Sequence, residues 1–194
     1  SPRLLVAGTL LTALHVGVSF ALGRWAAPML PVGVDSTGKV VWEDWHPGHC
    51  DPARRTSPGW WHDQEQASLS DFLGRVITAF ADPDRLPALR FQLMFGIAAM
   101  NDRGFVEQRV MMGTAGLEHL DGPDVVTQIR NRLVHPRGAH ERVHRLGGLV
   151  AEVWLLTRHY LVLLILHSLG YQASYRDLRR TRGWAGEVGN VPWK

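Results

Sequence analysis

The sequence predicts a mainly α-helical protein, a helical bundle preceded by an N-terminal helix and a short β-hairpin. Three observations lead to this prediction. After residue 65, apolar residues recur at steps of three and four positions over long stretches of the chain. Prolines and glycines separate these stretches from one another. Two short apolar runs flank the turn-forming sequence Asp-Ser-Thr-Gly at 35–38, which favours a hairpin.

The first expected helix covers Leu4 to Leu22, a run without a charged residue. Such a length can span a membrane, but the run contains Gly8, His15 and Gly17, and its flanks give no clear orientation signal. We therefore expect a buried helix and no membrane contact, with a membrane-anchored assembly protein as an alternative. Two strands at 29–34 and 39–45 should follow, and then a loop at 47–58 that is rich in Pro, Gly, His and Arg.

The remaining chain should form helices that end at recognisable stops. The helix after residue 124 should end near Val134, because a residue before proline is steered away from helical geometry. Gly170 suits the end of the longest helix. The expected helices are 66–81, 86–101, 105–120, 124–134 and 141–169, followed by a basic turn or helix at 174–182 and an irregular tail.

The length of 194 residues suits one domain with an appendage. We expect an N-terminal part at residues 1–64, formed by the helix, hairpin and loop, and a helical domain at 65–194. The start at Ser1 suggests that upstream sequence is missing. Cys50 is the single cysteine, so no intrachain disulfide can form, and a cytoplasmic location is favoured.

The basic residues are almost all arginine. Lys39 and Lys194 are the only lysines among 21 basic residues, and the net charge is +3. Arginine suits bidentate contacts with phosphate, although a GC-rich genome explains this composition equally well. A Gly-rich phosphate loop, a nucleophile elbow and a dinucleotide fingerprint are all absent from the sequence, which argues against nucleotide hydrolases and dehydrogenases.

The most informative motif is the stretch 130–136, Arg-Asn-Arg-Leu-Val-His-Pro. Histidine moves protons near neutral pH, and arginine can hold a phosphate under attack. RNA supplies its own 2′-hydroxyl nucleophile, so such a site needs no metal or cofactor. We expect His135 to act as general acid or base, Arg130 to stabilise the phosphorane and Asn131 to position the phosphate or the imidazole. The products would carry 2′,3′-cyclic phosphate and 5′-hydroxyl ends.

Spacing alone does not establish this site. About one Arg-x4-His pair is expected by chance in a chain of this composition, and a solvated arginine with a helix-capping histidine explains the motif as well. A single histidine also cannot easily serve as both base and acid. The chemistry therefore predicts a homodimer in which two motifs face one cleft.

The motif resembles that of the HEPN domains, and within them the ApeA-like HEPN proteins of bacterial anti-phage defence. The resemblance includes the preceding helix end at 116–120, Gly-Leu-Glu-His-Leu. It extends to the flanking elements Trp42-Glu43-Asp44-Trp45, Trp60-Trp61, Leu169-Gly170-Tyr171 and Val191-Pro192-Trp193.

This resemblance implies a HEPN-like helical bundle that dimerises through its motif-bearing helices. It implies a metal-independent endoribonuclease that acts on RNA in anti-phage defence or toxin-like growth arrest, with Arg130 and His135 as the catalytic residues. An upstream regulatory domain is also implied. The alternative within the same family is a non-catalytic module that binds RNA or a protein partner. We expect Arg132 and Arg137 to contact the substrate and Glu118 to pair with an arginine near the cleft.

Two further clusters point to weaker hypotheses. The loop residues His46, His49, Cys50 and His62 could supply zinc ligands, but their spacing matches no standard zinc motif, so we expect no metal site. A basic run could track an RNA backbone beside two aromatic residues, or could form a solvated helix face. The run comprises Arg176, Arg179, Arg180 and Arg182, beside Tyr175 and Trp184.

Overall fold

The computed structural model describes residues 2–53, 58–62, 65–120, 149–179 and 188–193. Its helices are α1 (Pro2–Leu22), α2 (Gln66–Phe80), α3 (Leu86–Met100), α4 (Val106–His119) and α6 (Leu149–Ser168). Its strands are β1 (Val32–Val34), β2 (Val40–Glu43), β3 (Ser174–Arg176) and β4 (Val188–Asn190). The predicted mainly helical fold, with an N-terminal helix and a short hairpin, is confirmed.

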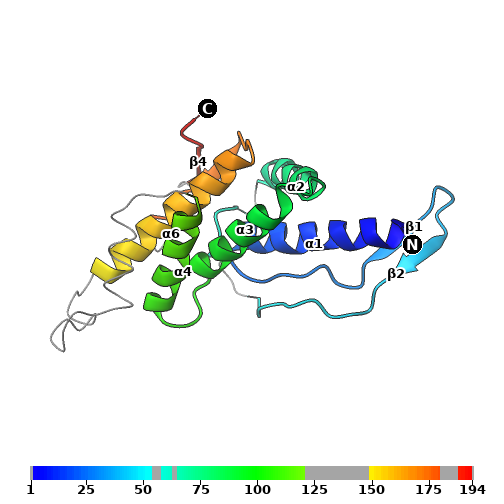
Figure 1. The fold of residues 1–194 in the computed structure, drawn as a ribbon, viewed down its shortest axis with the longest axis horizontal. Coiled ribbons are helices and arrows are strands. Elements are labelled where there is room, and N and C mark those ends of the chain that lie inside the picture. The colour runs from blue at the N-terminus through cyan, green and yellow to red at the C-terminus, as the bar shows by residue number, and fades with distance from the viewer. Residues whose placement is uncertain (1, 54–57, 63–64, 121–148, 180–187, 194) are drawn as a thin grey trace.

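The molecule is elongated, with a helical bundle at one end and the β1–β2 hairpin at the other (Figure 1). Helix α4 packs on α3 and α6, while α1 packs on α2 and α3. The first residues of α1 point toward the hairpin end of the molecule (Figure 1). Only the second half of α1 is therefore available to the core of the bundle.

The core is centred on a cluster of aromatic rings from distant parts of the sequence. Trp60, in the loop before α2, is fully buried, and its ring lies 5.0 Å from that of Phe72 and 5.3 Å from that of Tyr171. Phe20 of α1 joins the same cluster at 6.2 Å from Trp60. Edge-to-face and tilted contacts of this kind add to the hydrophobic gain from burial. The cluster thus ties α1, α2 and the chain after α6 into one core.

Glycines allow α4 to approach α6 closely. A Cβ atom on Gly113 would lie 2.6 Å from Cγ2 of Thr157 in α6, and one on Gly116 would lie 2.9 Å from Cβ of Phe95 in α3. Such distances essentially never occur for real Cβ atoms, so a larger residue at either position would push the neighbouring helix away.

The C-terminal end of α6 is stabilised by two arginines from other segments. Gly170 has a φ of 66°, the left-handed conformation that commonly ends a helix. The Nη1 group of Arg75 donates to the Gly170 carbonyl oxygen at 2.5 Å, and Nη2 of Arg85 donates to that of Ser168 at 3.0 Å. These bonds satisfy carbonyl groups that a helix end otherwise leaves without partners.

The predicted hairpin is present, although its strands are shorter than expected. The carboxylate of Asp35 accepts hydrogen bonds from the backbone N–H groups of Thr37 and Lys39 at 2.8 and 3.1 Å. Gly38 adopts a φ of 83°. These turn interactions are the reason for the Asp and Gly in this sequence.

The prediction of a basic turn or helix at 174–182 is wrong at its start. Residues 174–176 form strand β3, which pairs antiparallel with β4, so that Tyr175 lies opposite Gly189. The β4 residues belong to the tail that the sequence suggested to be irregular. Three-residue strands whose partners are twelve or more positions away leave little periodic signal in the sequence.

Other helix predictions agree with the structure over α2, α3 and α4 to within two residues at each end. The expected helix at 124–134 and the start of the one at 141–169 lie outside the described residues. Within the described part of the chain, none of the helices combines the length and the apolar character needed to span a membrane.

Candidate functional site

The predicted ribonuclease residues fall almost entirely outside the described part of the chain. Arg130, Asn131, Arg132, His135 and Arg137 all belong to the range 121–148. The remaining predicted residue, Glu118, is the penultimate residue of α4 and is half-buried. Its pairing with an arginine of the motif stays a prediction. The structure therefore places one predicted site residue and does not bring a site together around it.

The basic run is largely used inside the fold. Arg176 donates a hydrogen bond to the carbonyl oxygen of Gly59 in the loop before α2. Arg179 binds Asp177 through both Nε and Nη2, at 3.0 and 2.5 Å. Arg180 and Arg182 lie outside the described residues. The two described arginines thus have structural partners, which weakens the hypothesis that this run tracks an RNA backbone.

A buried histidine lies beside the same acidic residue. His159 of α6 is 5% exposed, and its Nδ1 lies 3.4 Å from Oδ1 of Asp177. Burial lowers the pKa of His159, and the positive charges of Arg179 and Arg158 add to this effect against the attraction of Asp177. Hydrogen bonding from Arg179 lowers the pKa of Asp177 to about 2. At neutral pH the His159 imidazole is therefore neutral and lies beside an ionised carboxylate. Because the residue is buried, an external substrate has little access to its ring.

The neighbouring Arg158 is also buried. Its Nε and Nη2 groups both donate to the carbonyl oxygen of Leu178, at 2.9 and 2.7 Å. Its guanidinium carbon lies 4.3 Å from the ring centroid of Trp154, and that of Arg109 lies 4.8 Å from the same ring. Burial is the main cause that lowers the pKa of Arg158 to about 10. This arrangement holds the segment after β3 against α6 by hydrogen bonding and cation–π attraction.

The loop histidines do not gather into a metal site within the described residues. The Nδ1 atom of His46 lies 2.8 Å from Asp44, in a contact confined to the loop. His15 of α1 donates from Nε2 to the carbonyl oxygen of His49 at 2.9 Å. Among the residues that the structure describes, no group of three or more His, Cys, Asp or Glu side chains could hold a metal ion.

Arg75 and Arg85 also line a surface hollow of about 480 Å³ between α2 and the end of α6. The guanidinium groups of both arginines already bind carbonyl oxygens at the end of α6. Both arginines that line the hollow are therefore already bound within the fold.

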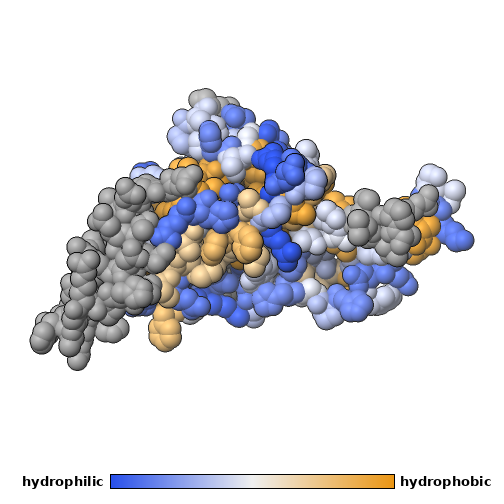
Figure 2. Space-filling view, viewed as in Figure 1, coloured by the Kyte–Doolittle hydropathy of each residue, from blue (hydrophilic) through white to orange (hydrophobic). Residues whose placement is uncertain are grey.

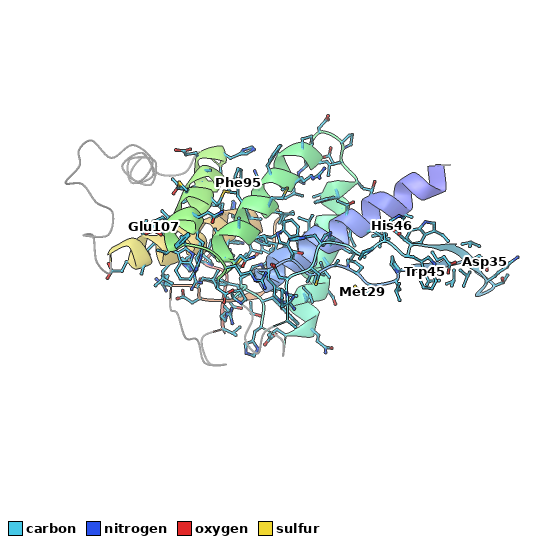
Figure 3. All side chains as sticks on the ribbon, turned by 90° about the horizontal axis from the view of Figure 1, so that it is seen from below. Met29, Asp35, Trp45, His46, Phe95 and Glu107 are labelled. Carbon is cyan, nitrogen blue, oxygen red and sulfur yellow. The ribbon has the colours of Figure 1, made fainter. Side chains whose placement is uncertain are left out.

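The most distinctive surface is a projection formed by residues 29–45, which we call the apolar arm. It contains strands β1 and β2, and among the described elements these strands pack chiefly on each other. The labelled residues Met29, Trp45 and Asp35 lie along this projection, away from Phe95 and Glu107 in the bundle (Figure 3). Figure 2 shows hydrophobic atoms at this end of the molecule beside a polar tip.

The arm exposes a high concentration of large hydrophobic side chains. Half of the large exposed hydrophobic residues in the described chain fall within these 17 positions, each between 51% and 69% exposed. They are Met29, Leu30, Val32, Val34, Val40, Val41 and Trp45. Exposed large hydrophobic residues that gather in one part of a protein surface mark interaction sites.

The arm has a rigid base. The backbone N–H of Asp51 donates to the carbonyl oxygen of Trp25 at 2.8 Å, and the Asp51 carboxylate accepts from the N–H of Trp25 at 3.0 Å. The ring of Trp25 also contacts those of His15 and His49, each with centroids 5.4 Å apart. The two chain segments that enter and leave the arm are therefore held together against α1.

No pattern in the sequence predicts that the arm is uncovered. Alternating residues such as those of Val32 to Val34 ordinarily indicate a strand with one buried face. Here the side chains at both ends of that strand are exposed. The useful signal was the absence of a third strand nearby, because an isolated two-stranded hairpin is marginally stable in water.

Comparison with protein families gives two matches along the chain. Residues 5–56 match the YopA central domain, and residues 97–190 match the YopA C-terminal domain. The first match contains most of α1 and the whole apolar arm, and the second runs from α3 to β4. Neither the curated proteins nor the solved structures include a match to this chain.

These matches overturn the resemblance to HEPN domains, and no HEPN family matches the chain. The structure shows why the flanking elements that contain tryptophan wrongly suggested a HEPN domain. Trp60 is a core residue, and the indole N–H of Trp193 donates to the carbonyl oxygen of Tyr171 at 2.8 Å. Such packing roles can place tryptophans at these positions in any helical fold, and the short Arg-x4-His motif is frequent by chance.

Proposed function

We propose that this chain, similar to YopA over that protein's central and C-terminal domains, is a binding module that docks a protein partner through the apolar arm. The observation that carries the proposal is the concentration of exposed large hydrophobic residues at 29–45. Covering them would recover roughly 25 cal/mol for each Å² of apolar surface.

Charge favours a protein over a nucleic acid or a lipid surface as the partner. Within residues 29–45, Asp35, Glu43 and Asp44 oppose the single basic residue Lys39. A site for phosphate groups would need an excess of positive charge, because such binding is dominated by electrostatic attraction. The arm instead combines apolar surface with a mixed, slightly acidic rim, as protein interfaces do.

The base of the arm supports the same function. Asp51 binds Trp25 on one side and the side-chain amide of Asn101 on the other, so the arm is anchored to the turn between α3 and α4. A pre-ordered binding element loses less conformational entropy on association than a flexible one. The apolar arm is therefore presented to its partner in a fixed direction.

The test is site-specific photo-crosslinking of the full chain in its native cells. A photoreactive phenylalanine analogue replaces Trp45 in the arm or, as the control, Phe105 at the start of α4. Both aromatic residues are strongly exposed, at 68% and 81%. We expect protein adducts from position 45 and few from position 105. Equal adduct yields at the two positions, or none at position 45, would overturn the proposal.

RNA cleavage is a second candidate function, supported by the residue types of the stretch 130–136, which follows α4 in the sequence. Arg130 could stabilise the attacked phosphate, with Asn131, Arg132 and Arg137 as further contacts, and His135 could transfer protons. The substrate would be RNA in the cytoplasm, and the setting defence or growth arrest. The test is incubation of wild-type and His135→Ala protein with total RNA in EDTA. Cyclic phosphate ends that form with the wild type alone support this candidate, whereas equal cleavage by both proteins removes His135 from it.

A further inference from the structure

We infer that the partner protein adds an extended strand to the outer edge of β1, beside Val32 and Val34, so that the hairpin of the apolar arm becomes a three-stranded sheet. The inference rests on the proposed docking function of the arm and names the element that occupies it. Three observations on the described residues support it: the direction of the main-chain groups of β1, the contrast between the two edges of the hairpin, and the side chains along β1.

The main-chain groups of β1 face two ways. The carbonyl oxygen of Pro31 accepts a hydrogen bond from the residue after β2 at 3.1 Å, and the N–H of Asp35 donates to the residue before β2 at 2.9 Å. Successive residues of a strand direct their N–H and C=O groups to opposite sides. Val32 and Val34 therefore direct theirs away from β2. The sheet consists of β1 and β2, so no other described strand pairs with these groups.

The two edges of the hairpin differ in how they are protected against a further strand. The register shifts after Gly33, so that Val41 of β2 is the extra residue of a bulge, and charged residues precede and end β2. Bulges and charges are the features with which proteins block the pairing of edge strands. The sequence has no charged residue between Arg24 and Asp35, and Pro31 faces β2, so it removes no donor from the outer edge. The edge of β1 is therefore the unprotected one.

The same edge presents apolar side chains on one face. Val32 and Val34 are both exposed, and they point to the same face because side chains alternate along a strand. Val40, which is also exposed, lies opposite Val34 and continues this face across the hairpin. An added strand would pack its alternate apolar residues beside these valines while its backbone bonds to β1. In this mode of recognition the main chain provides affinity and the alternate side chains provide selectivity.

The occupant is a strand of another protein rather than β1 of a second copy. Gly33 is the middle residue of β1, so two copies that paired antiparallel through Val32 and Val34 would place their glycines opposite each other. Cross-strand side-chain contacts stabilise a sheet, and a pair of glycines makes none. A partner strand with a large residue at this place can instead pack beside Trp42. That side chain lies next to Gly33, where an added Cβ atom would be 3.5 Å from the indole atom Cε3.

Proline at an outward-facing position tests the backbone contact. Val34→Pro removes a donor from the outer edge of β1 and places the proline ring there, but it preserves the hydrogen bonds to β2. Val40→Pro is the matched control, because Val40 lies opposite Val34 and its N–H faces the other edge. We expect Val34→Pro to lower the yield of the partner adduct from position 45 about tenfold in the native cells, and Val40→Pro to lower it less than about twofold. Both variants should unfold at the same temperature.

A second measurement locates the added strand without a proline substitution. A photoreactive phenylalanine analogue replaces Val32 or Val34 in the otherwise wild-type chain, and the adducts formed in the native cells are digested and sequenced by mass spectrometry. We expect both positions to label one short segment of one partner protein, at sites about two residues apart, because paired strands advance in step. The order of the two sites along that segment gives the direction of the added strand.

Three results would overturn the inference. Equal adduct yields from the two proline variants would show that the partner does not use the backbone of β1. Labelled sites far apart in the partner sequence would exclude a single added strand. Adducts with the mass of two copies of this chain would identify a second copy as the occupant. In all three cases the wild-type adduct from position 45 preserves the docking function, whereas the absence of that adduct would refute the docking function itself.

Discussion

Asp51 and Asn101 meet in a hydrogen bond of 3.0 Å between the Asp51 carboxylate and the Asn101 amide. Asp51 lies just after the apolar arm, and Asn101 ends α3. The same carboxylate lies 3.3 Å from a guanidinium nitrogen of Arg103. A single side chain that is only about 10% exposed therefore joins the arm to the bundle. It also joins the two segments that match the YopA central and C-terminal domains.

Replacing Asp51 with alanine should loosen this connection. The substitution leaves the backbone N–H of Trp25 and the amide of Asn101 without their acceptor, and a buried polar group that loses its partner costs about 1–3 kcal/mol. We expect the free energy of unfolding to fall by about that amount in urea denaturation. Asp44→Ala is the matched control because, among the described residues, its carboxylate bonds to the backbone N–H and the ring of the exposed His46 alone, and it should change stability by less than about 0.5 kcal/mol. Equal effects of the two substitutions would contradict the anchoring role of Asp51.

Two tryptophans of opposite exposure provide a test of the core. Trp60 is fully buried within the aromatic cluster, whereas Trp45 in the apolar arm is 68% exposed. We expect Trp60→Ala to lower the free energy of unfolding by about 3–5 kcal/mol, the usual cost of removing a large core aromatic side chain. Trp45→Ala should cost less than about 0.5 kcal/mol when measured at a concentration at which the chain is monomeric. If the two substitutions lowered the free energy of unfolding by similar amounts, the aromatic cluster around Trp60 would not be the centre of the core.

Stability should depend on pH through His159. Because its pKa is lower in the folded chain than the ordinary value of 6.5, the unfolded chain binds the proton more readily. The folded state is therefore fully favoured above pH 6.5, and it loses stability as the pH falls from 6.5 toward the lower folded pKa. We expect His159→Gln to flatten this part of the curve. A curve that His159→Gln does not alter would assign the titration to another group.

Arg158 should not be replaceable by lysine. The planar guanidinium makes two hydrogen bonds to the Leu178 carbonyl oxygen while it lies over the ring of Trp154. A lysine ammonium keeps the charge, but it lacks the two coplanar N–H donors and the planar surface of a guanidinium. We expect Arg158→Lys to destabilise the fold by about 1–3 kcal/mol, from lost hydrogen bonds to a buried partner. The control is Arg179→Lys, because Arg179 is exposed and follows Leu178 directly; it should destabilise the fold less than Arg158→Lys does. A larger loss of stability from Arg179→Lys than from Arg158→Lys would contradict the structural role of Arg158.

The sequence predicted those parts of the fold whose signals are local. The apolar spacing from Leu69 to Phe80 and the turn chemistry of Asp35 and Gly38 depend on neighbours within a few positions, so α2 and the hairpin were found. Strand β3 was missed because its partner β4 lies twelve or more positions away. The burial of His159 depends on packing against the segment that contains Asp177, which no local pattern encodes.

The proposed docking surface could be predicted even less. The two strands predicted at 29–34 and 39–45 expose their apolar residues only because no other described element covers them, and that is a property of the whole arrangement. The motif at 130–136 carries suggestive residue types, but chemistry depends on distances between side chains, which spacing in the sequence does not supply. The YopA matches overturn the HEPN resemblance, and the exposed residues of the arm are the feature on which the proposed function rests.

The most direct test of the docking surface is photo-crosslinking from position 45 in the native cells, with the otherwise wild-type chain beside Val41→Asp and Met94→Asp proteins. Both substitutions place a charge on an exposed apolar residue, the first in the apolar arm and the second on α3. Our account predicts a protein adduct for the wild type and for Met94→Asp, and loss of that adduct for Val41→Asp with unchanged thermal unfolding. The same adduct yield for all three proteins would contradict it.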